Sequence, residues 1–212
     1  MTHKRLHTRS RGHFSAVWLA GALAATQLAG CAPLLVGGAM LGGTMMFVDR
    51  RTTGTQLEDQ AIELKANNRL RDIVGDRSHV NVTSYNRTVL ITGEAATDAD
   101  KASIEQTVQR VENVRSTVNE LEVMLPSALA PRSNDALLTG KVKATFVDAR
   151  DLQANAFKVV TERGNVYLMG RVTEREATRA TELARAVSGV QKVVRVFEIV
   201  TEQELADSAP KK

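Results

Sequence analysis

Apolar residues recur along this chain with two spacings, and each spacing occurs in two separate stretches. A spacing of three to four positions, which predicts one buried face of a helix, occurs in an early and in a late stretch. The two stripes are Ile62, Ala66 and Leu70, and Leu138, Val142 and Phe146, so that position 62 corresponds to position 138. Alternation of apolar and polar residues, which predicts strands, follows each stripe. We therefore expect an internal repeat.

Each helical stripe is followed by a predicted β-hairpin. The ranges 82–93 and 159–170 both contain β-rich runs, so that position 82 corresponds to position 159. Polar turn residues separate the two runs in each hairpin, Asn86-Arg87 in the first and Arg163-Gly164 in the second. The helical stripes and the hairpins are displaced by almost the same length of chain, so the hairpins belong to the same repeat.

A second helix is predicted after each hairpin. It opens near Thr97 in the first copy and near Thr173 in the second, because hydroxyl side chains cap the first free amide groups of a helix. It closes at Asn113 or Gly189, residue types that adopt the left-handed conformation common at helix ends. Both copies therefore have the order helix, strand, strand, helix, strand once a final strand is added.

That final strand is predicted from alternating residues at 114–123 and 190–200. Two prolines, Pro126 and Pro131, predict a short, stiff linker between the copies. The predicted organisation is a signal peptide at 1–30, a lipidated N-terminus and flexible tether at 31–54, a first domain at 55–125, a linker at 126–133, a second domain at 134–201 and a disordered tail at 202–212.

The N-terminal segment 1–30 has the basic and then apolar order of a secretory signal. The apolar run at 15–27 is shorter than the about 20 residues that a membrane-spanning helix needs. Leu28-Ala29-Gly30-Cys31 matches the cleavage and lipidation box of bacterial lipoproteins. We predict that Cys31 becomes the first residue and carries diacylglycerol and an N-acyl chain. The alternative is an ordinary signal peptide that contains a free cysteine.

An apolar segment rich in glycine follows at 32–48. A second membrane span is one interpretation, but the segment is short and its four glycines weaken a helix by up to about 1 kcal/mol each. We favour a flexible tether beside the membrane. Ala32, rather than aspartate, follows Cys31, which by resemblance to enterobacterial lipoprotein sorting implies the outer membrane, with the protein facing the periplasm.

Removal of the signal peptide changes what the charge predicts. The full sequence has a net charge of +4 and a pI near 9.4, values that suggest a nucleic-acid partner. Four basic residues leave with the signal, so 24 basic residues (28 − 4) face 24 acidic ones. Aromatic residues make up only 4% and offer no stacking platform for bases. We expect no nucleic-acid partner.

The mature chain lacks the constellations that enzymes and metal centres use. His79 is the only histidine after residue 30, and Cys31 is the only cysteine. The mature chain therefore has few histidine or cysteine side chains that could form a nucleophile with its base or a cluster of metal ligands. We predict no catalytic residue, no metal site and no cofactor beyond the lipid on Cys31, and His79 is predicted simply to precede the hairpin strand.

Several motifs in the right order carry a family resemblance. The hairpins ending in Gly93 and Gly170, with the turn Val-Ser-Gly189-Val, resemble a tandem pair of BON domains, and the match covers nearly all of the mature chain. Together with the lipidation box, the lead-in 49–56 and the segment 168–177, this layout is similar to the dual-BON outer-membrane lipoproteins. Asn113 stands where the BON pattern has glycine.

The resemblance implies an α+β fold of two αββαβ modules, each a small three-stranded mixed sheet packed on two helices. It also implies attachment to the inner leaflet of the outer membrane, binding of anionic phospholipids such as phosphatidylglycerol, and a role in envelope integrity with enrichment at the division site. Gly93, Asn113, Gly170 and Gly189 are implied to be structural positions at turns and close approaches.

Charge separates the two copies. Residues 55–125 carry 8 basic and 12 acidic side chains, whereas 133–201 carry 11 basic and 8 acidic ones, so only the second copy suits an anionic surface. Its first helix has a second line of residues at helical spacing beside the core stripe. With the neighbouring lysine, we take this line as the phospholipid-binding surface: Leu137, Lys141, Lys143, Ala144 and Val147.

The corresponding line in the first copy, Ala61, Lys65, Asn68 and Arg71, is polar. The resemblance points to the same helix of the second copy, although the family pattern has tryptophan where this chain has Leu137. Leucine lacks the indole that favours a membrane interface, which leaves the strength of binding open. The alternative is that Leu137 and Val147 pack against the first copy as a domain interface.

A second function class is an interaction adaptor. In this interpretation the acidic first copy binds an envelope-assembly or cell-wall protein, and lipid and protein partners can coexist, one for each domain. Binding of lipid through basic residues should weaken as salt screens the charges, which distinguishes the two.

Overall fold

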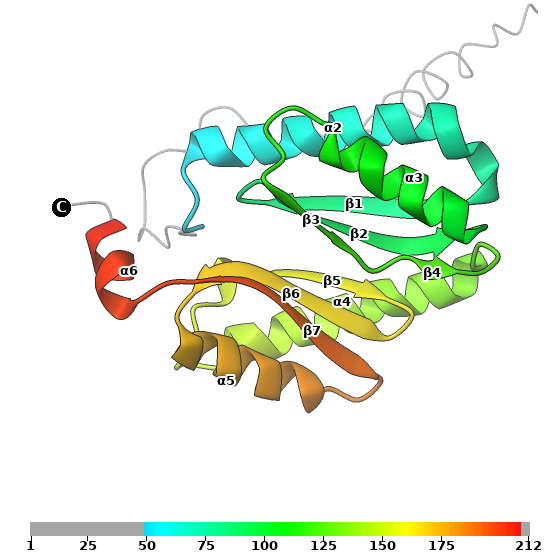
Figure 1. Cartoon of the computed structure of the whole chain (residues 1–212). Helices are drawn as coiled ribbons and strands as arrows, with labels where there is room; N and C mark the ends of the chain where they lie inside the picture. Colours follow the sequence, from blue (N-terminus) through cyan, green and yellow to red (C-terminus); the bar gives the residue numbers. More distant parts are fainter. Residues whose placement is uncertain (1–48, 209–212) are drawn as a thin grey trace, which may run out of the picture. The chain divides into compact units, whose positions relative to one another are not determined.

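The computed structural model describes residues 49–208, drawn in colour in Figure 1, and within them helix, strand, strand, helix, strand occurs twice in succession. This order confirms the predicted α+β repeat. The first repeat comprises α2 (Thr53–Val74), β1 (His79–Tyr85), β2 (Thr88–Ala95), α3 (Asp98–Gln109), β3 (Ser116–Asn119) and β4 (Glu122–Val123). The second comprises α4 (Leu129–Asp148), β5 (Lys158–Glu162), β6 (Asn165–Val172), α5 (Glu174–Arg185) and β7 (Lys192–Ile199). Short 3-10 helices, η1 (Gly75–Arg77) and η2 (Ala154–Ala156), precede β1 and β5, and α6 (Glu202–Ser208) follows β7.

Each repeat contains one mixed sheet. In the first, β2 pairs antiparallel with β1 and parallel with β3, and in the second β6 pairs in the same way with β5 and β7. The middle strand of each sheet is therefore the second strand of a hairpin. The last strand returns beside it after a helical crossover, which is how parallel neighbours are connected.

Two helices cover one face of each sheet. The predicted stripe of α2 lies in the first core, where Ile62 and Ala66 are fully buried beside Val89 and Ile91 of β2. The stripe of α4 does the same in the second repeat, where Val142 and Phe146 pack with the strands and with α5. Phe146 also contacts Phe157 edge to face, with ring centroids 5.3 Å apart.

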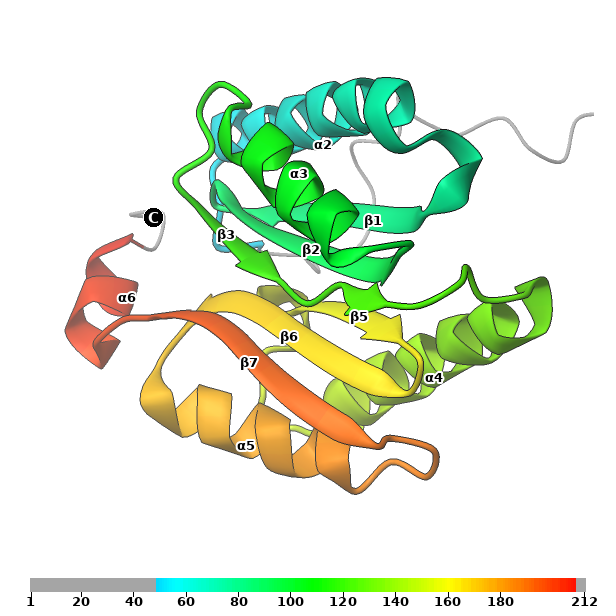
Figure 2. The same ribbon diagram turned by 45° about the vertical axis from the view of Figure 1, so that its right-hand side comes forward.

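The opposite faces of the two sheets meet each other. Both repeats belong to one compact unit, Met46–Lys212, and in Figure 2 the sheets lie between the two pairs of helices. Tyr85 and Leu90 of the first sheet form a buried cluster with Tyr167 and Met169 of the second. Each sheet therefore packs on helices with one face and on the other sheet with the opposite face, and the two repeats share a third core.

The hairpin turns have the geometry that two-residue connections favour. Asn86 and Arg87 have φ values of 48° and 66°, and Arg163 and Gly164 have values of 50° and 73°. Two consecutive residues with positive φ match the twist of the flanking strands. Thr97 and Thr173 accept hydrogen bonds from the backbone N–H three residues later, which confirms both predicted helix caps.

The linker between the repeats is shorter than predicted. Helix α4 begins at Leu129, so the last five residues of the predicted linker 126–133 are helical. Pro131 lies in the first turn of α4, where its missing N–H would have no partner within the helix in any case. Its presence therefore marks a helix start rather than a linker.

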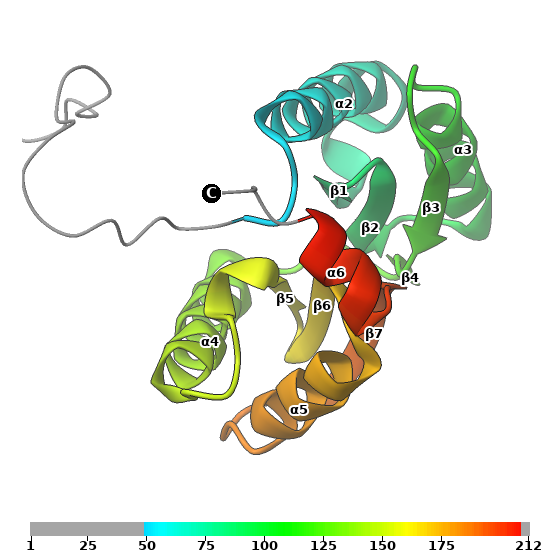
Figure 3. The same ribbon diagram turned by 90° about the vertical axis from the view of Figure 1, so that its left-hand side faces the viewer.

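The tail predicted to be disordered forms a helix over most of its length. Figure 3 shows α6 directly after β7. The hydroxyl of Thr201 accepts from Glu204 N–H, and the carboxylate of Glu204 accepts from Thr201 N–H and from its hydroxyl. This reciprocal pair is a capping box, and the spacing Thr-x-x-Glu is its sequence signal.

The last strand of the first repeat is interrupted. Its predicted extent is 114–123, but β3 covers Ser116–Asn119 and β4 only Glu122–Val123. Both strands keep the same register with β2, and between them Leu121 is buried in the first core while its N–H donates to Oδ1 of Asn119. The equivalent strand β7 is continuous from Lys192 to Ile199.

Cys31, the signal peptide and the apolar segment 32–48 lie outside the described residues. Between residues 49 and 208, none of the helices combines the length and apolarity that crossing a bilayer requires.

Candidate functional site

Helix α4 carries apolar residues on two opposite faces. One face buries Leu138, Val142 and Phe146 in the core of the second repeat. On the other face the side chains of Leu137 and Val147 are 66% and 71% exposed. An amphipathic surface helix would carry polar residues there. The outer face of α4 is therefore an apolar surface without an internal partner.

Small residues complete this surface. Ala136, Gly140 and Ala144 are exposed on the same side of the helix as Leu137 and Val147, and we call these five residues the α4 outer strip. A helix has about 3.6 residues per turn, so Lys143 borders one side of the strip and Lys141 the other. Both lysines are exposed. Two cations therefore flank an apolar band, which ends at the exposed carboxylate of Asp148, the last residue of α4.

Neither lysine is neutralised by a neighbour. Among residues 49–208, no acidic side chain lies within ion-pair distance of Lys141 or Lys143. The counterpart of Lys141 in the first repeat, Lys65, lies 3.5 Å from the carboxylate of Glu112. Both helices have a lysine at this position, and they differ in whether an acidic side chain lies beside it.

The alternative role of Leu137 and Val147, an interface with the first repeat, is wrong. Their exposed fractions leave both side chains open to solvent. The contact between the repeats is made instead by the inner sheet faces, with Tyr85 and Tyr167 buried in it. The predicted phospholipid surface is therefore accessible, and whether it binds lipid stays a prediction.

A cavity of about 450 Å³ opens beside the strip. Leu137 and Lys141 form part of its wall from α4, while Arg163, Gly189 and Gln191 line it from the hairpin turn and the end of α5. The cavity thus joins an apolar side chain, a free lysine amine and the backbone around a left-handed glycine. Its size suits a small polar group next to the apolar strip.

The charge difference between the repeats also gives ion pairs across their contact, which the sequence did not indicate. Lys158 lies 2.8 Å from Glu63, Arg163 lies 3.3 Å from Glu94, and Lys192 lies 4.0 Å from Glu120. In each pair the cation comes from the second repeat and the carboxylate from the first. Part of the positive charge assigned to an anionic surface therefore serves the contact between the repeats.

A buried aspartate near the start of each first helix fixes the hairpin turn. Asp59 accepts from the backbone N–H groups of Asn86 and Arg87 at 2.8 Å. Asp135, its equivalent in the second repeat, accepts from Arg163 and Gly164, also at 2.8 Å. The sequence signal for this role is an aspartate three positions before the core stripe of each repeat.

Burial by itself raises the pKa of Asp59, but hydrogen bonds from the Ser84 hydroxyl, the Arg87 N–H and the Arg51 guanidinium outweigh it. The pKa of this carboxyl therefore lies below its usual value. The carboxylate form is the one that accepts these bonds, so the turn is held most firmly when Asp59 is charged.

The end of the predicted flexible tether is part of the fold. Arg50 makes two hydrogen bonds to the carboxylate of Glu176, at 2.7 and 2.8 Å, and a third to the backbone of Arg171 in the second repeat. Arg51 lies 2.7 Å from Asp59 in the first repeat, with its guanidinium 4.3 Å from the ring centroid of Tyr85. The residues just before α2 thus contact both repeats.

The predicted structural turns occupy special backbone positions. A Cβ on Gly93, where φ is 111°, would lie 2.1 Å from the carbonyl oxygen of His79. On Gly170 it would lie 2.4 Å from the carbonyl oxygen of Ala156. Asn113 and Gly189 have φ values of 69° and 101°, in the left-handed region. The asparagine thus adopts the backbone form that the family pattern assigns to glycine.

His79, predicted to precede the hairpin strand, is the first residue of β1. Its Nδ1 lies 3.0 Å from Oε2 of Glu94, and Glu162 of the second repeat lies close to both. A histidine with two carboxylates is a set of side chains that metals bind. The register of the first hairpin pairs His79 with Glu94, but no sequence signal brings Glu162, which belongs to the other sheet.

Comparisons with known proteins agree with the repeat. The BON domain family model matches residues 58–124 and 134–201. The outer membrane lipoprotein DolP of Haemophilus influenzae is 38% identical over 173 residues, which cover 80% of this chain and 89% of that protein. A 21 kDa hemolysin of Actinobacillus pleuropneumoniae is 32% identical over 155 residues, covering 72% and 80%.

The C-terminal domain of CdsD, the structural protein of the type III secretion system of Chlamydia trachomatis, aligns with 62% of this chain and 96% of its own at 11% identity and a TM-score of 0.28, too low to carry an argument. The two BON matches span most of the described residues, and the lipoprotein relative covers both repeats. The chain therefore belongs to the BON-domain family, as a dual-BON protein of the DolP type.

Proposed function

We propose that this chain is a non-enzymatic outer-membrane lipoprotein that binds anionic phospholipid through the α4 outer strip. The observation that carries the proposal is the exposure of Leu137 and Val147 between two lysines that have no acidic partner in the described part of the chain. The name of the Haemophilus influenzae relative, an outer membrane lipoprotein, supports the location.

The strip has the properties of a helix that lies along a membrane surface. The apolar residues enter the boundary between headgroups and acyl chains, while Lys141 and Lys143 remain at headgroup level. A cation near an anionic surface contributes about 1 kcal/mol, so the two lysines together contribute about 2 kcal/mol, or roughly thirtyfold in affinity. Ala136, Gly140 and Ala144 leave the backbone close to the lipid.

The cavity beside the strip extends this contact to a headgroup. Lys141, Arg163 and Gln191 line the cavity, so a phosphate would meet donors from α4 and from two turns. Asp135 lines it too, but its carboxylate already accepts from the N–H groups of Arg163 and Gly164. Arg163 is already paired with Glu94 and Glu122, which leaves Lys141 as the cation available for the phosphate. We therefore assign headgroup recognition to Lys141.

Lipid on Cys31 supplies the durable anchor in this proposal. One acyl chain gives only marginal membrane binding, whereas several chains together hold a protein stably. Cys31→Ser should abolish incorporation of labelled palmitate and leave the precursor uncleaved by the lipoprotein peptidase. Normal processing of this variant to a soluble form would contradict the lipoprotein assignment.

The α4 outer strip then determines where in the membrane the anchored protein resides. A surface that prefers anionic lipid concentrates the protein where such lipid is enriched, and we propose the division site as that location, with a role in envelope integrity. The preference comes from the second repeat, because α2 belongs to the acidic repeat and its Lys65 is paired with Glu112, although Leu57 and Leu64 are exposed on that helix.

Vesicle co-sedimentation tests the lipid proposal with matched variants. A form of the chain that begins at residue 46 should bind vesicles containing phosphatidylglycerol and not vesicles of neutral lipid. Leu137→Glu and Lys141→Glu should each abolish binding, whereas Leu64→Glu and Lys65→Glu, at exposed sites on α2, should leave it unchanged. Equal effects from the two pairs would reject the strip as the binding surface.

A second function is favoured by one observation on α2. Leu57 and Leu64 are 67% and 62% exposed and lie two helical turns apart on one side of this acidic repeat. We propose this face as a contact for an envelope-assembly or cell-wall protein. Cross-linking in intact cells should give a partner adduct that Leu57→Glu or Leu64→Glu removes and Leu137→Glu preserves. An adduct that survives both α2 variants would reject the face.

A further inference from the structure

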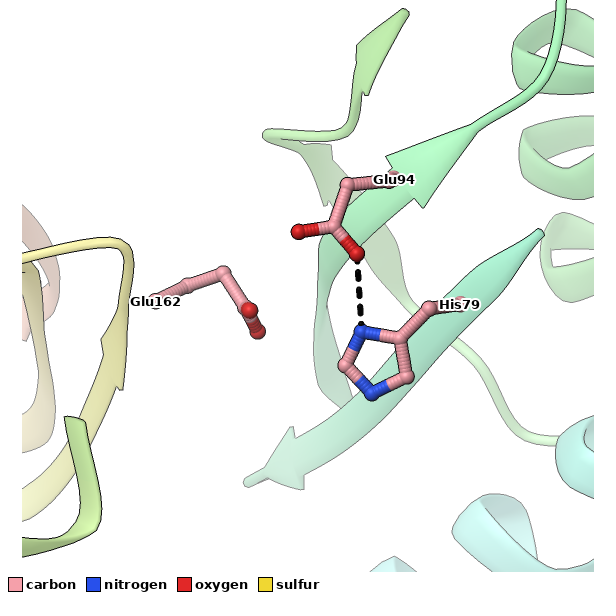
Figure 4. Close-up of side chains that lie close together, drawn as sticks. All are labelled: His79, Glu94 and Glu162. Carbon is pink, nitrogen blue, oxygen red and sulfur yellow. Dashed lines mark hydrogen bonds and ion pairs between the residues drawn. The ribbon is translucent and has the colours of Figure 1, made fainter. Parts of the chain in front are cut away.

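Three side chains from three strands converge where the two repeats meet. His79 begins β1, Glu94 lies near the end of β2, and Glu162 ends β5 of the other repeat (Figure 4). One donor atom from each of them lies within 4.8 Å of the other two. The carboxylate of Glu162 points toward the space between Glu94 and the imidazole in Figure 4.

Both carboxylates are buried. Glu94 is fully buried and Glu162 is only 3% exposed. A buried carboxylate needs a nearby cation or several hydrogen bonds, because its hydration has been lost. The partners of the two carboxylates therefore decide whether the cluster is complete without a ligand.

Glu94 has its partners within the protein. Its Oε2 lies 3.0 Å from His79 Nδ1, and its Oε1 accepts from Arg163 Nη1 at 3.3 Å. Arg163 is shared with a further carboxylate, since its Nη2 lies 2.7 Å from Glu122 Oε1 in an ion pair without hydrogen-bonding angles. One guanidinium thus serves two carboxylates.

Glu162 has no such compensation. Its Oε2 accepts one hydrogen bond from the side-chain amide of Asn81, at 2.9 Å. Across residues 49–208, its Oε1 accepts no hydrogen bond and no cation lies within ion-pair distance of the carboxylate. Arg132 borders the same cavity, but its guanidinium donates to the hydroxyl of Ser127. Glu94 and Glu122 therefore share one arginine, while Glu162 has no cation among the described residues and its free oxygen reaches solvent through the cavity.

The space between His79, Glu94 and Glu162 suits a bound metal ion. A tetrahedral ion with bonds of about 2.0–2.1 Å holds its ligand atoms about 3.3 Å apart. The separation of 3.0 Å between His79 and Glu94 is already near this value, and small side-chain rotations of Glu162 close the remainder. Histidine nitrogen and glutamate oxygen are both ligands that zinc accepts.

Access and a fourth ligand are also provided. A cavity of about 510 Å³ is lined by His79, Asn81 and Glu162 and leads to the surface between α4 and β5. An ion can enter by this route, and water can occupy a fourth position. Asn81 donates to Glu162 and so orients the carboxylate from behind, as the outer partners of metal ligands do.

We propose that His79, Glu94 and Glu162 bind one divalent transition-metal ion, zinc by preference, and that this ion joins the two BON repeats. The ion supplies the positive charge that Glu162 lacks. Two ligands come from the first repeat and one from the second, so binding requires the repeats to be docked. Metal therefore stabilises the contact between them, and its affinity falls at acidic pH as protons compete for the ligands.

The test uses the mature lipidated chain, without a histidine tag, in detergent micelles after removal of metal with EDTA. Titration calorimetry with zinc chloride should give one site per chain and a higher melting temperature. His79→Gln and Glu162→Gln should weaken binding by at least the about 10–100-fold that loss of an outer partner costs. Glu182→Gln, at an exposed carboxylate on α5, is the matched control and should bind like the parent.

A second measurement uses the single histidine of the mature chain. Its imidazole ring should give one NMR signal set that shifts on addition of zinc, and Glu162→Gln should reduce the shift at the same zinc concentration. Because Gln has nearly the shape of Glu, the fold should persist. If Glu162→Gln unfolds the protein, Glu162→Asp takes its place. This variant keeps the negative charge, but its shorter side chain moves the carboxylate oxygens away from the ion, so zinc binding should again weaken.

Two results would overturn the proposal. One is that the parent protein binds zinc no more tightly than His79→Gln does. The other is unchanged affinity in Glu162→Gln and Glu162→Asp, which would show that the ion, if bound, does not join the repeats. A protonated His79 bridging the two carboxylates would give the first result.

Discussion

Arg50 and Glu176 are 126 residues apart in the chain and form a bidentate ion pair, with both nitrogen–oxygen distances below 3 Å and side chains only 8% and 6% exposed. The arginine comes from the lead-in to the first repeat and the glutamate from the first turn of α5 in the second. Glu176 also completes the cap of α5 by accepting from Thr173 N–H. One carboxylate thus connects the lead-in, the helix start and the docked repeats.

Arg50→Ala should therefore destabilise the protein. Removing one partner of a buried ion pair leaves the other charge without compensation, at a cost of about 3 kcal/mol. Urea unfolding followed by circular dichroism measures this as a lower midpoint. Arg175→Ala, which removes an exposed arginine 3.5 Å from Glu202, is the control and should change stability by less than about 1 kcal/mol.

Stability should fall on acidification. Burial raises the pKa of Asp59 and of Glu176, but hydrogen bonds from Ser84 to Asp59 and from Arg50 to Glu176 outweigh it, so the folded-state pKa of each carboxyl lies below its usual value. A lowered folded-state pKa gives stability that is present above the unfolded value and lost as the pH falls through the folded one.

The urea midpoint should thus be flat above about pH 5 and decrease below it. Asp59→Asn should lower stability at pH 7 and reduce the dependence on pH, because the variant has one fewer group to protonate. A variant as sensitive to acid as the parent would mean that other carboxylates account for the acid loss.

Asp135→Ala should destabilise the second hairpin. The carboxylate accepts from two backbone N–H groups of the turn, at Arg163 and Gly164, and hydrogen bonds to a charged group contribute about 1.5–3 kcal/mol. We expect a loss of about 2–3 kcal/mol and faster amide hydrogen exchange at these two residues. Asp148→Ala, at the exposed end of α4, should leave both unchanged.

Two glycines should respond in opposite directions to alanine. Gly140 lies inside α4 with nothing within 4 Å of a new Cβ, so Gly140→Ala should stabilise the protein by about 0.5–1 kcal/mol. At Gly93 the Cβ would lie 2.1 Å from a carbonyl oxygen and the φ value is positive, so Gly93→Ala should prevent stable folding. Thermal unfolding of both variants provides the comparison.

Leu137→Trp should strengthen binding to anionic vesicles several-fold, because an indole favours the interface more than leucine does. The exposed position allows the larger side chain without disturbing the core. Affinity of both forms should decrease with added salt, and Lys141→Gln should show a weaker salt dependence. A tryptophan fluorescence shift that requires phosphatidylglycerol is the direct measurement, and an equal shift with neutral vesicles would contradict the charge contribution.

Sequence patterns were sufficient for the elements of each repeat. The stripes beginning at Ile62 and Leu138, the caps at Thr97 and Thr173 and the turns at Asn86 and Arg163 are all determined by neighbours within a few residues. Local propensity and periodicity therefore predict them. The helices that were missed, the start of α4 and α6, carried local signals too: a proline in a first turn and a Thr-x-x-Glu box at Thr201.

Contacts between distant segments could not be predicted in this way. Tyr85 and Tyr167 contact each other's sheets in the shared core. A strand that is buried on both faces can be predicted from its pattern, but the segment that packs against it cannot. His79 and Glu94 are cross-strand partners in the first hairpin, but the contact of Glu94 with Arg163 depends on how the sheets face each other, which no periodicity encodes. The exposure of the α4 outer strip could likewise not be predicted, because it depends on the repeats contacting each other through other surfaces.

Arg50 and Arg51 are docked onto the repeats close to the proposed anchor. With lipid on Cys31, as proposed, 18 Cα–Cα steps (49 − 31) join the anchor to residue 49, where the described structure begins, a reach of at most about 60 Å. So short a connection gives α4 an effective concentration near the bilayer of the order of millimolar. A lipid site too weak to hold a free protein on a vesicle is then strong enough to orient an anchored one, and lengthening this segment should loosen that orientation without altering the site.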